Sequence, residues 1–103
     1  MTKKRTKIYI AGPITGVEDY RERFAEAERR LTAQGYIALN PAILPEGMST
    51  ADYMRICLAM LDTADAVAML PGWGKSMGAG IEHTLARYTG KPVWVEGDTY
   101  GQT

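Results

Sequence analysis

Glu82 is the acidic residue whose surroundings best suit chemistry. It closes the segment Ser76-Met77-Gly78-Ala79-Gly80-Ile81-Glu82, in which glycines stand two and four positions before the acid. Small residues at those positions leave room for a ligand, and a carboxylate in a pocket can act as a nucleophile or stabilise cationic charge. The alternative is an acid that only offsets the dipole of its own helix.

Two turns carry the other candidate ligand contacts. One holds Gly12, Pro13, Ile14, Thr15 and Gly16, and the other runs from Pro71 to Ser76 and includes Gly72 and Trp73. Glycines let the backbone approach a ligand closely, and each turn leads into a helix N-terminus whose amides favour an anion. We therefore expect a phosphate or carboxylate site between the two turns, unless the glycines and prolines only make the turns.

Alternating strands and helices must position these residues. Apolar, β-favouring runs and helical periodicity predict strands at 8–11, 36–39, 66–70 and 92–95, and helices at 17–34, 50–63 and 77–88. Thr15 with Glu18 predicts a capping box for the first helix, and Ser49 with Asp52 predicts an N-terminal cap for the second. Gly35 is expected to end the first helix.

This order predicts one α/β domain over residues 1–103: a flavodoxin-like (Rossmann-like) parallel sheet of four to five strands flanked by helices. Residues 1–6 and 97–103 are expected to be tails, although 96–103 could instead complete a neighbouring subunit. The uninterrupted apolar run 66–70 predicts a central strand. In this fold, ligands bind where the strand order reverses between the first and third strands, which lead into the two turns.

Composition limits the kind of partner. Twelve Lys and Arg balance twelve Asp and Glu, so no net charge would hold a nucleic-acid polymer or a membrane surface. The apolar run before Gly12 is too short for a signal peptide or a membrane span. The single cysteine, Cys57, indicates a reducing, cytoplasmic environment. We expect a small-molecule ligand, without metal or cofactor.

Three common uses of the fold lack their key residues. Met69 stands where a Walker phosphate loop ending at Gly74-Lys75-Ser76 would need glycine. Glycines do not follow the first strand in dinucleotide-binding spacing, and the third strand ends in Leu70-Pro71 without a phosphoacceptor aspartate. The sequence is not that of an evident NTPase, dehydrogenase or receiver domain.

The chain resembles the nucleoside 2-deoxyribosyltransferase-like superfamily, which includes 2'-deoxynucleoside 5'-phosphate N-hydrolases and a group of small phage-type proteins. The resemblance rests on the spacing of Ser76, Gly78 and Glu82 and on three segments: Tyr9-Ile10-Ala11-Gly12-Pro13-Ile14, Ala64-Asp65-Ala66-Val67 and Gly90-Lys91-Pro92-Val93. It implies N-glycosidic bond cleavage or base exchange on a (deoxy)nucleoside 5'-monophosphate, with a hydrolase or transferase outcome.

The resemblance also implies roles for single residues. Glu82 corresponds to the nucleophile that attacks the anomeric carbon, and Tyr9 to a residue that orients this carboxylate or contacts the sugar. Ser76 corresponds to a serine directed toward a 5'-phosphate. Gly12, Ile14 and Gly78 would complete the cradle for phosphate and sugar.

Three residues keep two interpretations each. Trp73 could stack on a base, or serve as a lid or subunit contact. Lys75 could neutralise a phosphate, or be an ordinary solvated lysine. His83 is expected at the surface or an interface rather than as a general acid, because neighbouring helix residues point about 100° apart.

Two positions depart from the superfamily pattern. Cys57 stands where an aspartate is usual, so another acid (Asp52, Asp62 or Glu46) substitutes or the chemistry is altered. Thr15 stands where the hydrolases tend to carry arginine. The alternative function is therefore a catalytically impaired module that binds or senses a nucleotide. The loop Pro71-Gly72-Trp73-Gly74 is only loosely similar to that of lysine-decarboxylase-like phosphoribohydrolases.

The helix 50–63 is apolar over a wider arc than one core requires. We expect its second face, formed by Met54, Leu58 and Leu61, to contact another subunit in a homodimer or higher homo-oligomer. The alternative is a helix sandwiched inside the monomer. A purely structural dimer built on this helix is a third function class, and it requires the glycine turns to have no ligand.

Overall fold

The computed structural model describes residues 5–95. Its elements are β1 (Lys7–Ala11), α1 (Tyr20–Ala33), β2 (Ile37–Leu39), the 3-10 turn η1 (Pro41–Ile43), α2 (Thr50–Thr63), β3 (Ala66–Met69), the 3-10 turn η2 (Trp73–Lys75), α3 (Met77–Tyr88) and β4 (Val93–Val95). The predicted order of strands and helices is confirmed. Residues 1–4 of the expected tail 1–6, the expected tail 97–103 and the alternative role of 96–103 lie outside the described residues. Thr6 is not a free tail residue, because its carbonyl accepts a hydrogen bond from the Ile37 N–H at 3.0 Å.

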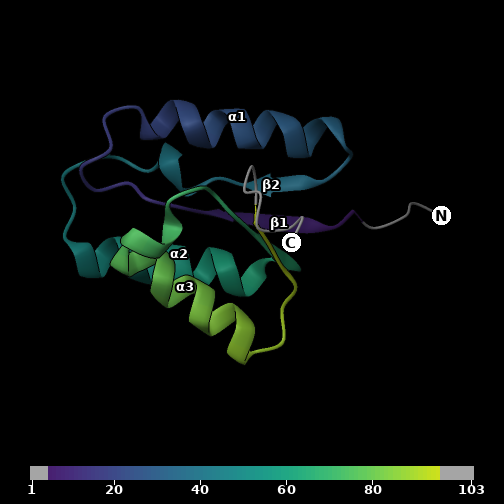
Figure 1. The fold of residues 1–103 in the computed structure, drawn as a ribbon. Coiled ribbons are helices and arrows are strands. Elements are labelled where there is room, and N and C mark those ends of the chain that lie inside the picture. Colours follow the sequence, from purple (N-terminus) through teal and green to yellow (C-terminus); the bar gives the residue numbers. More distant parts are fainter. Residues whose placement is uncertain (1–4, 96–103) are drawn as a thin grey trace.

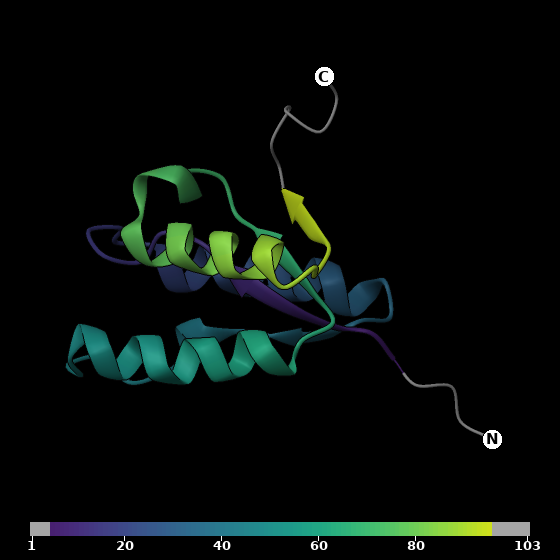
Figure 2. The ribbon, with the colours of Figure 1, turned by 90° about the horizontal axis from the view of Figure 1, so that it is seen from below.

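The strands form one parallel sheet in the order β2-β1-β3-β4. Figure 1 shows α1 covering one face of the sheet and α2 with α3 covering the other. Seen from below in Figure 2, α2 and α3 lie side by side. This arrangement confirms the flavodoxin-like α/β class with four strands. It makes β1 and β3 the central pair, and the central place of β3 is the one that its uninterrupted apolar run predicts.

Side chains of the central strands alternate between two cores. Ile8 and Ile10 pack with Phe24 of α1, whereas Tyr9 and Ala11 pack with Cys57 and other residues of the α2 and α3 layer. The alternation follows from the two-residue period of a strand. Tyr9 therefore belongs to the same layer as α3, the helix that carries Glu82.

The predicted N-terminal cap is confirmed for α2 but not for α1. The Ser49 hydroxyl oxygen accepts a hydrogen bond from the Asp52 N–H at 3.1 Å, as predicted. The capping box expected at Thr15 and Glu18 is wrong, because α1 begins after Asp19 and no side chain caps it. Gly16 has φ +79°, a conformation that a right-handed helix excludes, so the chain cannot become helical before that residue.

The expected subunit-contact face of α2 is partly used inside the chain. Leu61 is fully buried and Leu58 packs against the core of the α2 and α3 layer. The prediction that Leu61 faces another subunit is therefore wrong, because α2 packs on the sheet and on α3 at once, which is the sandwiched alternative. Oligomerisation stays a prediction. Within residues 5–95, no helix combines the length and apolar character needed to cross a membrane.

Candidate active site

The two glycine-containing turns meet at the carboxyl edge of β1 and β3. The Leu70 N–H donates a hydrogen bond to the Ala11 carbonyl at 2.8 Å, which continues the pairing of the two strands to their ends. A Cβ atom at Gly12 would lie 2.9 Å from the Leu70 Cβ, closer than two such atoms approach. Glycine at position 12 therefore permits this close contact, and the predicted convergence of the turns is confirmed.

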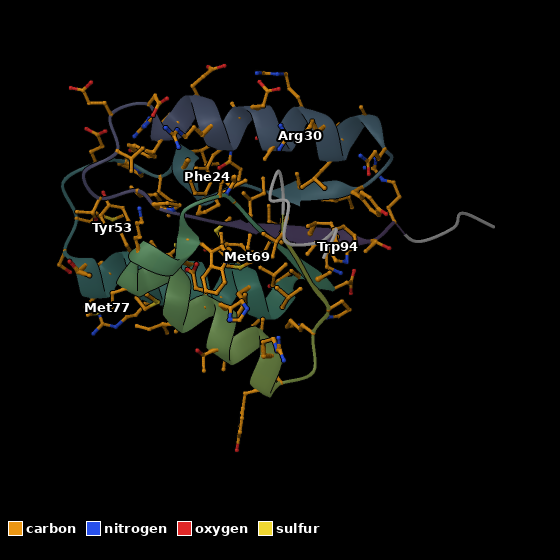
Figure 3. All side chains as sticks on the ribbon, in the orientation of Figure 1. Phe24, Arg30, Tyr53, Met69, Met77 and Trp94 are labelled. Carbon is orange, nitrogen blue, oxygen red and sulfur yellow. The ribbon has the colours of Figure 1, made fainter. Side chains whose placement is uncertain are left out.

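A cavity of about 880 Å³ opens at this edge. The predicted site residues that line it are Tyr9, Gly12, Pro13, Ile14, Thr15, Gly72, Ser76, Gly78 and Glu82. Figure 3 shows Tyr53 and Met77, two further lining residues, at this same end of the molecule. The volume is in the range of small-molecule sites in proteins, which run from roughly 300 to 1,000 Å³.

Tyr9 and Glu82 form the central polar contact of the cavity. The Tyr9 hydroxyl donates a hydrogen bond to Glu82 Oε2 at 2.8 Å. Tyr9 is 0% exposed and Glu82 only 6% exposed. β1 points Tyr9 into the layer below the sheet, and the second turn of α3 brings Glu82 to it. The two residues that the resemblance to the superfamily pairs are therefore in direct contact.

Burial controls the protonation of this pair. It raises the pKa of Glu82 to about 7, and the hydrogen bond from Tyr9 offsets part of that rise. Burial first, and the Glu82 charge second, raise the pKa of Tyr9 far above its usual value. Tyr9 is consequently a permanent hydrogen-bond donor, whereas Glu82 is available as a carboxylate or as an acid near neutral pH.

Cys57 lines the cavity beside this pair. Its side chain is buried, and burial is the main cause that raises the pKa of the thiol, with the Glu82 charge adding to the rise. The interaction with Tyr9 acts in the opposite direction and does not compensate. The thiol is therefore neutral, and it does not supply the negative charge of a carboxylate at this position.

Among the three acids considered as substitutes for an aspartate at position 57, only Glu46 lines the cavity. Its carboxylate accepts a hydrogen bond from the Tyr20 hydroxyl at 3.1 Å. Asp52 instead pairs with Arg55 at 3.0 Å on the exposed side of α2. The fold therefore separates Asp52 and Asp62 from the cavity and leaves Glu46 at its wall.

The second turn presents two groups suited to an anion. Lys75 and Ser76 both line the cavity directly before α3. The Ser76 oxygen accepts a hydrogen bond from the Ala79 N–H at 3.2 Å, which caps α3 and leaves the hydroxyl hydrogen for a ligand. This turn can offer a hydroxyl donor, an ammonium group and a helix N-terminus to one negatively charged group.

Two predicted contacts are outside the cavity. Trp73 does not line it; its ring stacks on His83, with centroids 4.2 Å apart and planes inclined by 19°. Gly16 is exposed and serves the turn before α1 through its positive φ. The structure therefore does not bring Trp73 and Gly16 to the cavity with the other predicted site residues.

One wall of the cavity, formed by α1, α2 and the loop between β2 and α2, was not predicted from the sequence. Tyr20, Arg23, Met48, Tyr53 and Met54 line this wall. The signal that could have found part of it is topological: helices that follow parallel strands begin at the carboxyl edge of the sheet, so their first turns border the ligand crevice. The loop gave no periodic pattern to interpret.

Across residues 5–95, no cluster of three or more His, Cys, Asp or Glu side chains is placed to hold a metal ion. The arrangement at the cavity is instead a buried carboxylate with a phenolic donor, next to a turn suited to an anion. Such a set can support attack by a carboxylate on an electrophilic carbon of a phosphorylated ligand.

No curated protein sequence matches the chain. A solved structure with the same fold is the 2-deoxyribosyltransferase of the psychrotolerant bacterium Bacillus psychrosaccharolyticus, described as a biocatalyst for the synthesis of antiviral and antitumoral nucleosides. The TM-score is 0.69 with 22% sequence identity, and the alignment covers 86% of this chain and 70% of that one. This likeness confirms the expected deoxyribosyltransferase-like fold. The sequence profile of a family described as a domain of unknown function (DUF4406) matches residues 6–95, nearly the whole chain, which therefore belongs to that family.

Proposed function

We propose that this chain is an enzyme that cleaves the N-glycosidic bond of a (deoxy)nucleoside 5'-monophosphate and passes the sugar to water or to a second base. The observation that carries the proposal is the buried carboxylate of Glu82, bound by the Tyr9 hydroxyl at 2.8 Å inside the cavity. The fold shared with a 2-deoxyribosyltransferase supports the same class of chemistry.

The proposed reaction has two displacement steps at the anomeric carbon. In the first, a Glu82 oxygen bonds to this carbon while the bond to the base nitrogen breaks, and the base leaves with the electron pair and takes a proton from solvent. In the second, water or another base bonds to the carbon and gives a proton to solvent, while the bond to the Glu82 oxygen breaks and its electron pair returns to the carboxylate. The carboxylate stabilises the positive charge that develops on the sugar in both steps.

Tyr9 has a supporting role in this scheme. Because its pKa is raised far above the usual value, it keeps its proton and cannot act as a base. Its hydrogen bond to one oxygen of Glu82 fixes the carboxylate and favours the ionised form. The other oxygen of Glu82 is then the one we assign to attack.

The preference for a phosphorylated substrate rests on the second turn. The Ser76 hydroxyl, the Lys75 ammonium and the start of α3 lie on the cavity close to one another in the chain. A 5'-phosphate is the part of a nucleotide that these donors suit best. The Thr15 side chain on the first turn adds a second hydroxyl to the same cavity.

The test is release of free base. The protein is incubated with a panel of deoxynucleoside and nucleoside 5'-monophosphates, with and without an acceptor base, and the products are separated by chromatography. Wild type should release base, and Glu82→Gln should slow the release about 1,000-fold or more. Glu22→Gln is the matched control, since Glu22 is exposed on α1. Absence of base release, or release that survives Glu82→Gln, would defeat the proposal.

A second candidate is a nucleotide-binding module without turnover. The neutral thiol of Cys57 favours it, because this position faces the Tyr9 and Glu82 pair and provides no charge for proton transfer. Calorimetry with the same nucleotides distinguishes the two. Binding with no base release over hours supports the module, and binding with release supports the enzyme.

A further inference from the structure

The loop between β3 and α3 faces the cavity on both sides of one tryptophan. Pro71 and Gly72 before it, and Lys75 and Ser76 after it, line the cavity. Trp73 does not line the cavity, and its ring lies on the imidazole of His83 in α3. The loop thus presents its polar residues to the cavity and its large aromatic ring to the helix.

The hydrogen bonds of this loop are local. The Trp73 N–H donates to the Leu70 carbonyl at 3.2 Å, the Lys75 N–H to the Gly72 carbonyl at 3.0 Å, and the Ser76 N–H to the Trp73 carbonyl at 3.0 Å. These bonds set the shape of the turn. Ser76 joins the end of the loop to the first turn of α3, because its hydroxyl oxygen accepts from the Ala79 N–H at 3.2 Å and its carbonyl from the Gly80 N–H at 2.9 Å. The stack of Trp73 on His83, with centroids 4.2 Å apart, connects the middle of the loop to the second turn of α3.

We propose that Trp73 and His83 form a clasp that holds loop 71–76 in place as a wall of the cavity. His83 is then a positioning residue for substrate binding. The expected effect of His83 on KM for the nucleotide rests on the proposed function. The expected effect of His83 on the position of the loop does not.

The position of His83 on α3 favours this positioning role over proton transfer to the substrate. His83 follows Glu82 directly on α3, so the two side chains leave the helix about 100° apart. Glu82 points into the cavity, whereas the imidazole of His83 does not line it and lies against Trp73. His83 therefore contributes a flat ring against which Trp73 stacks. The ring of a phenylalanine could provide the same surface.

Paired substitutions test this point. His83→Ala removes the stack and should raise KM for the nucleotide, or its Kd measured by calorimetry, about twofold to tenfold with kcat within about twofold. His83→Phe keeps an aromatic ring and should restore wild-type KM. Loss of kcat in both variants would overturn the proposal in favour of proton transfer, and an unchanged KM and Kd in His83→Ala would overturn it as well.

A readout without substrate tests the clasp by itself. In a Trp94→Phe background Trp73 is the single tryptophan, because the sequence holds two. His83→Ala should shift the Trp73 emission to longer wavelength and speed hydrogen exchange at the Lys75 and Ser76 amides about tenfold. His83→Phe should do neither, and the α2 amides should be unchanged in both, which shows that the variants fold.

The two proposals fail in different ways. If wild type neither binds nucleotide nor releases base, the proposed function fails, and the emission and exchange measurements still decide the clasp. If His83→Ala leaves emission and exchange unchanged, the clasp is overturned whatever the activity of the enzyme.

Discussion

The Tyr9 hydroxyl and the Glu82 carboxylate lie 2.8 Å apart although 73 positions separate them in the chain. One residue comes from the central strand and the other from the last helix of the described region, so the contact forms only when the sheet and α3 are assembled. A carboxylate buried to this degree is costly unless it is hydrogen-bonded or protonated. The fold therefore buries a carboxyl group, that of Glu82, which gains or loses its proton near neutral pH.

The first prediction concerns the pH dependence of activity. Because the nucleophile must be ionised, kcat/KM should rise with pH around a midpoint near the Glu82 pKa of about 7. Tyr9→Phe removes the hydrogen bond that lowers this pKa, so the midpoint should move upward. Base release measured from pH 5 to 9 in both proteins checks this; a midpoint that stays in place would contradict the assigned role of Tyr9.

The second prediction concerns stability. The folded-state pKa of Glu82, about 7, is above the ordinary value of 4.5, so the folded protein favours the neutral acid. The stability that this acid contributes is complete below pH 4.5 and is lost as pH rises through 7. Glu82→Gln does not titrate, so its free energy of unfolding relative to that of wild type should rise by about 3 kcal/mol between pH 4.5 and pH 8.

Urea unfolding at pH 4.5 and pH 8 measures this difference. The advantage of Glu82→Gln over wild type should be larger at pH 8 than at pH 4.5. Glu22→Gln provides the reference, since Glu22 is exposed and its loss should change little between the two values. A Glu82→Gln advantage that does not grow with pH would argue against the burial of an ionisable carboxyl at this site.

The third prediction uses two glycines of α3 that face different surroundings. Gly78 lines the cavity, and a Cβ atom there would meet only the flexible end of Met54, at 3.5 Å. A Cβ atom at Gly80 would meet nothing within 4 Å. Both Gly→Ala variants should fold with at least wild-type stability, because alanine favours a helix over glycine by about 1 kcal/mol.

The two variants should differ in activity. If the sugar lies against α3, Gly78→Ala occupies its space and should lower kcat/KM by roughly tenfold to a hundredfold. Gly80→Ala should leave kcat/KM unchanged. Thermal melting and steady-state kinetics of both proteins measure this pair, and equal activity of the two would place the substrate elsewhere in the cavity.

The sequence predicted the parts of this molecule that depend on periodic patterns. The apolar run of β3 and the glycines after β1 and β3 are local signals, and they place Gly12 and Ser76 at one edge of the sheet. The contact between Tyr9 and Glu82 followed from the resemblance to a known superfamily. The hydrogen bond at 2.8 Å shows the contact, and the likeness to a deoxyribosyltransferase structure bears on the fold alone.

The features that the sequence did not predict depend on tertiary packing. Tyr53 holds the loop before α2, since its hydroxyl donates to the Pro45 carbonyl and accepts from the Met48 N–H at 3.4 Å, and nothing periodic marks that loop. The direction of Trp73 was equally open, because a ring between two glycines can turn either way. In the structure the ring stacks on the imidazole of His83 and packs against the core of the α2 and α3 layer.

The last prediction uses Cys57, the single cysteine of the sequence, as a reporter of the cavity. Cys57 is 8% exposed, and burial raises the pKa of its thiol, so alkylation by iodoacetamide at pH 8 should be at least about tenfold slower than in the urea-unfolded chain. Because Cys57 lines the cavity, a saturating deoxynucleoside monophosphate should slow the reaction of the folded protein further and leave the unfolded chain unaffected. Mass spectrometry of the alkylated fraction over time gives both rates. Equal rates with and without nucleotide in the folded protein would mean that the ligand does not enter the cavity beside Tyr9, and the assignment of Glu82 as its nucleophile would lose its structural basis.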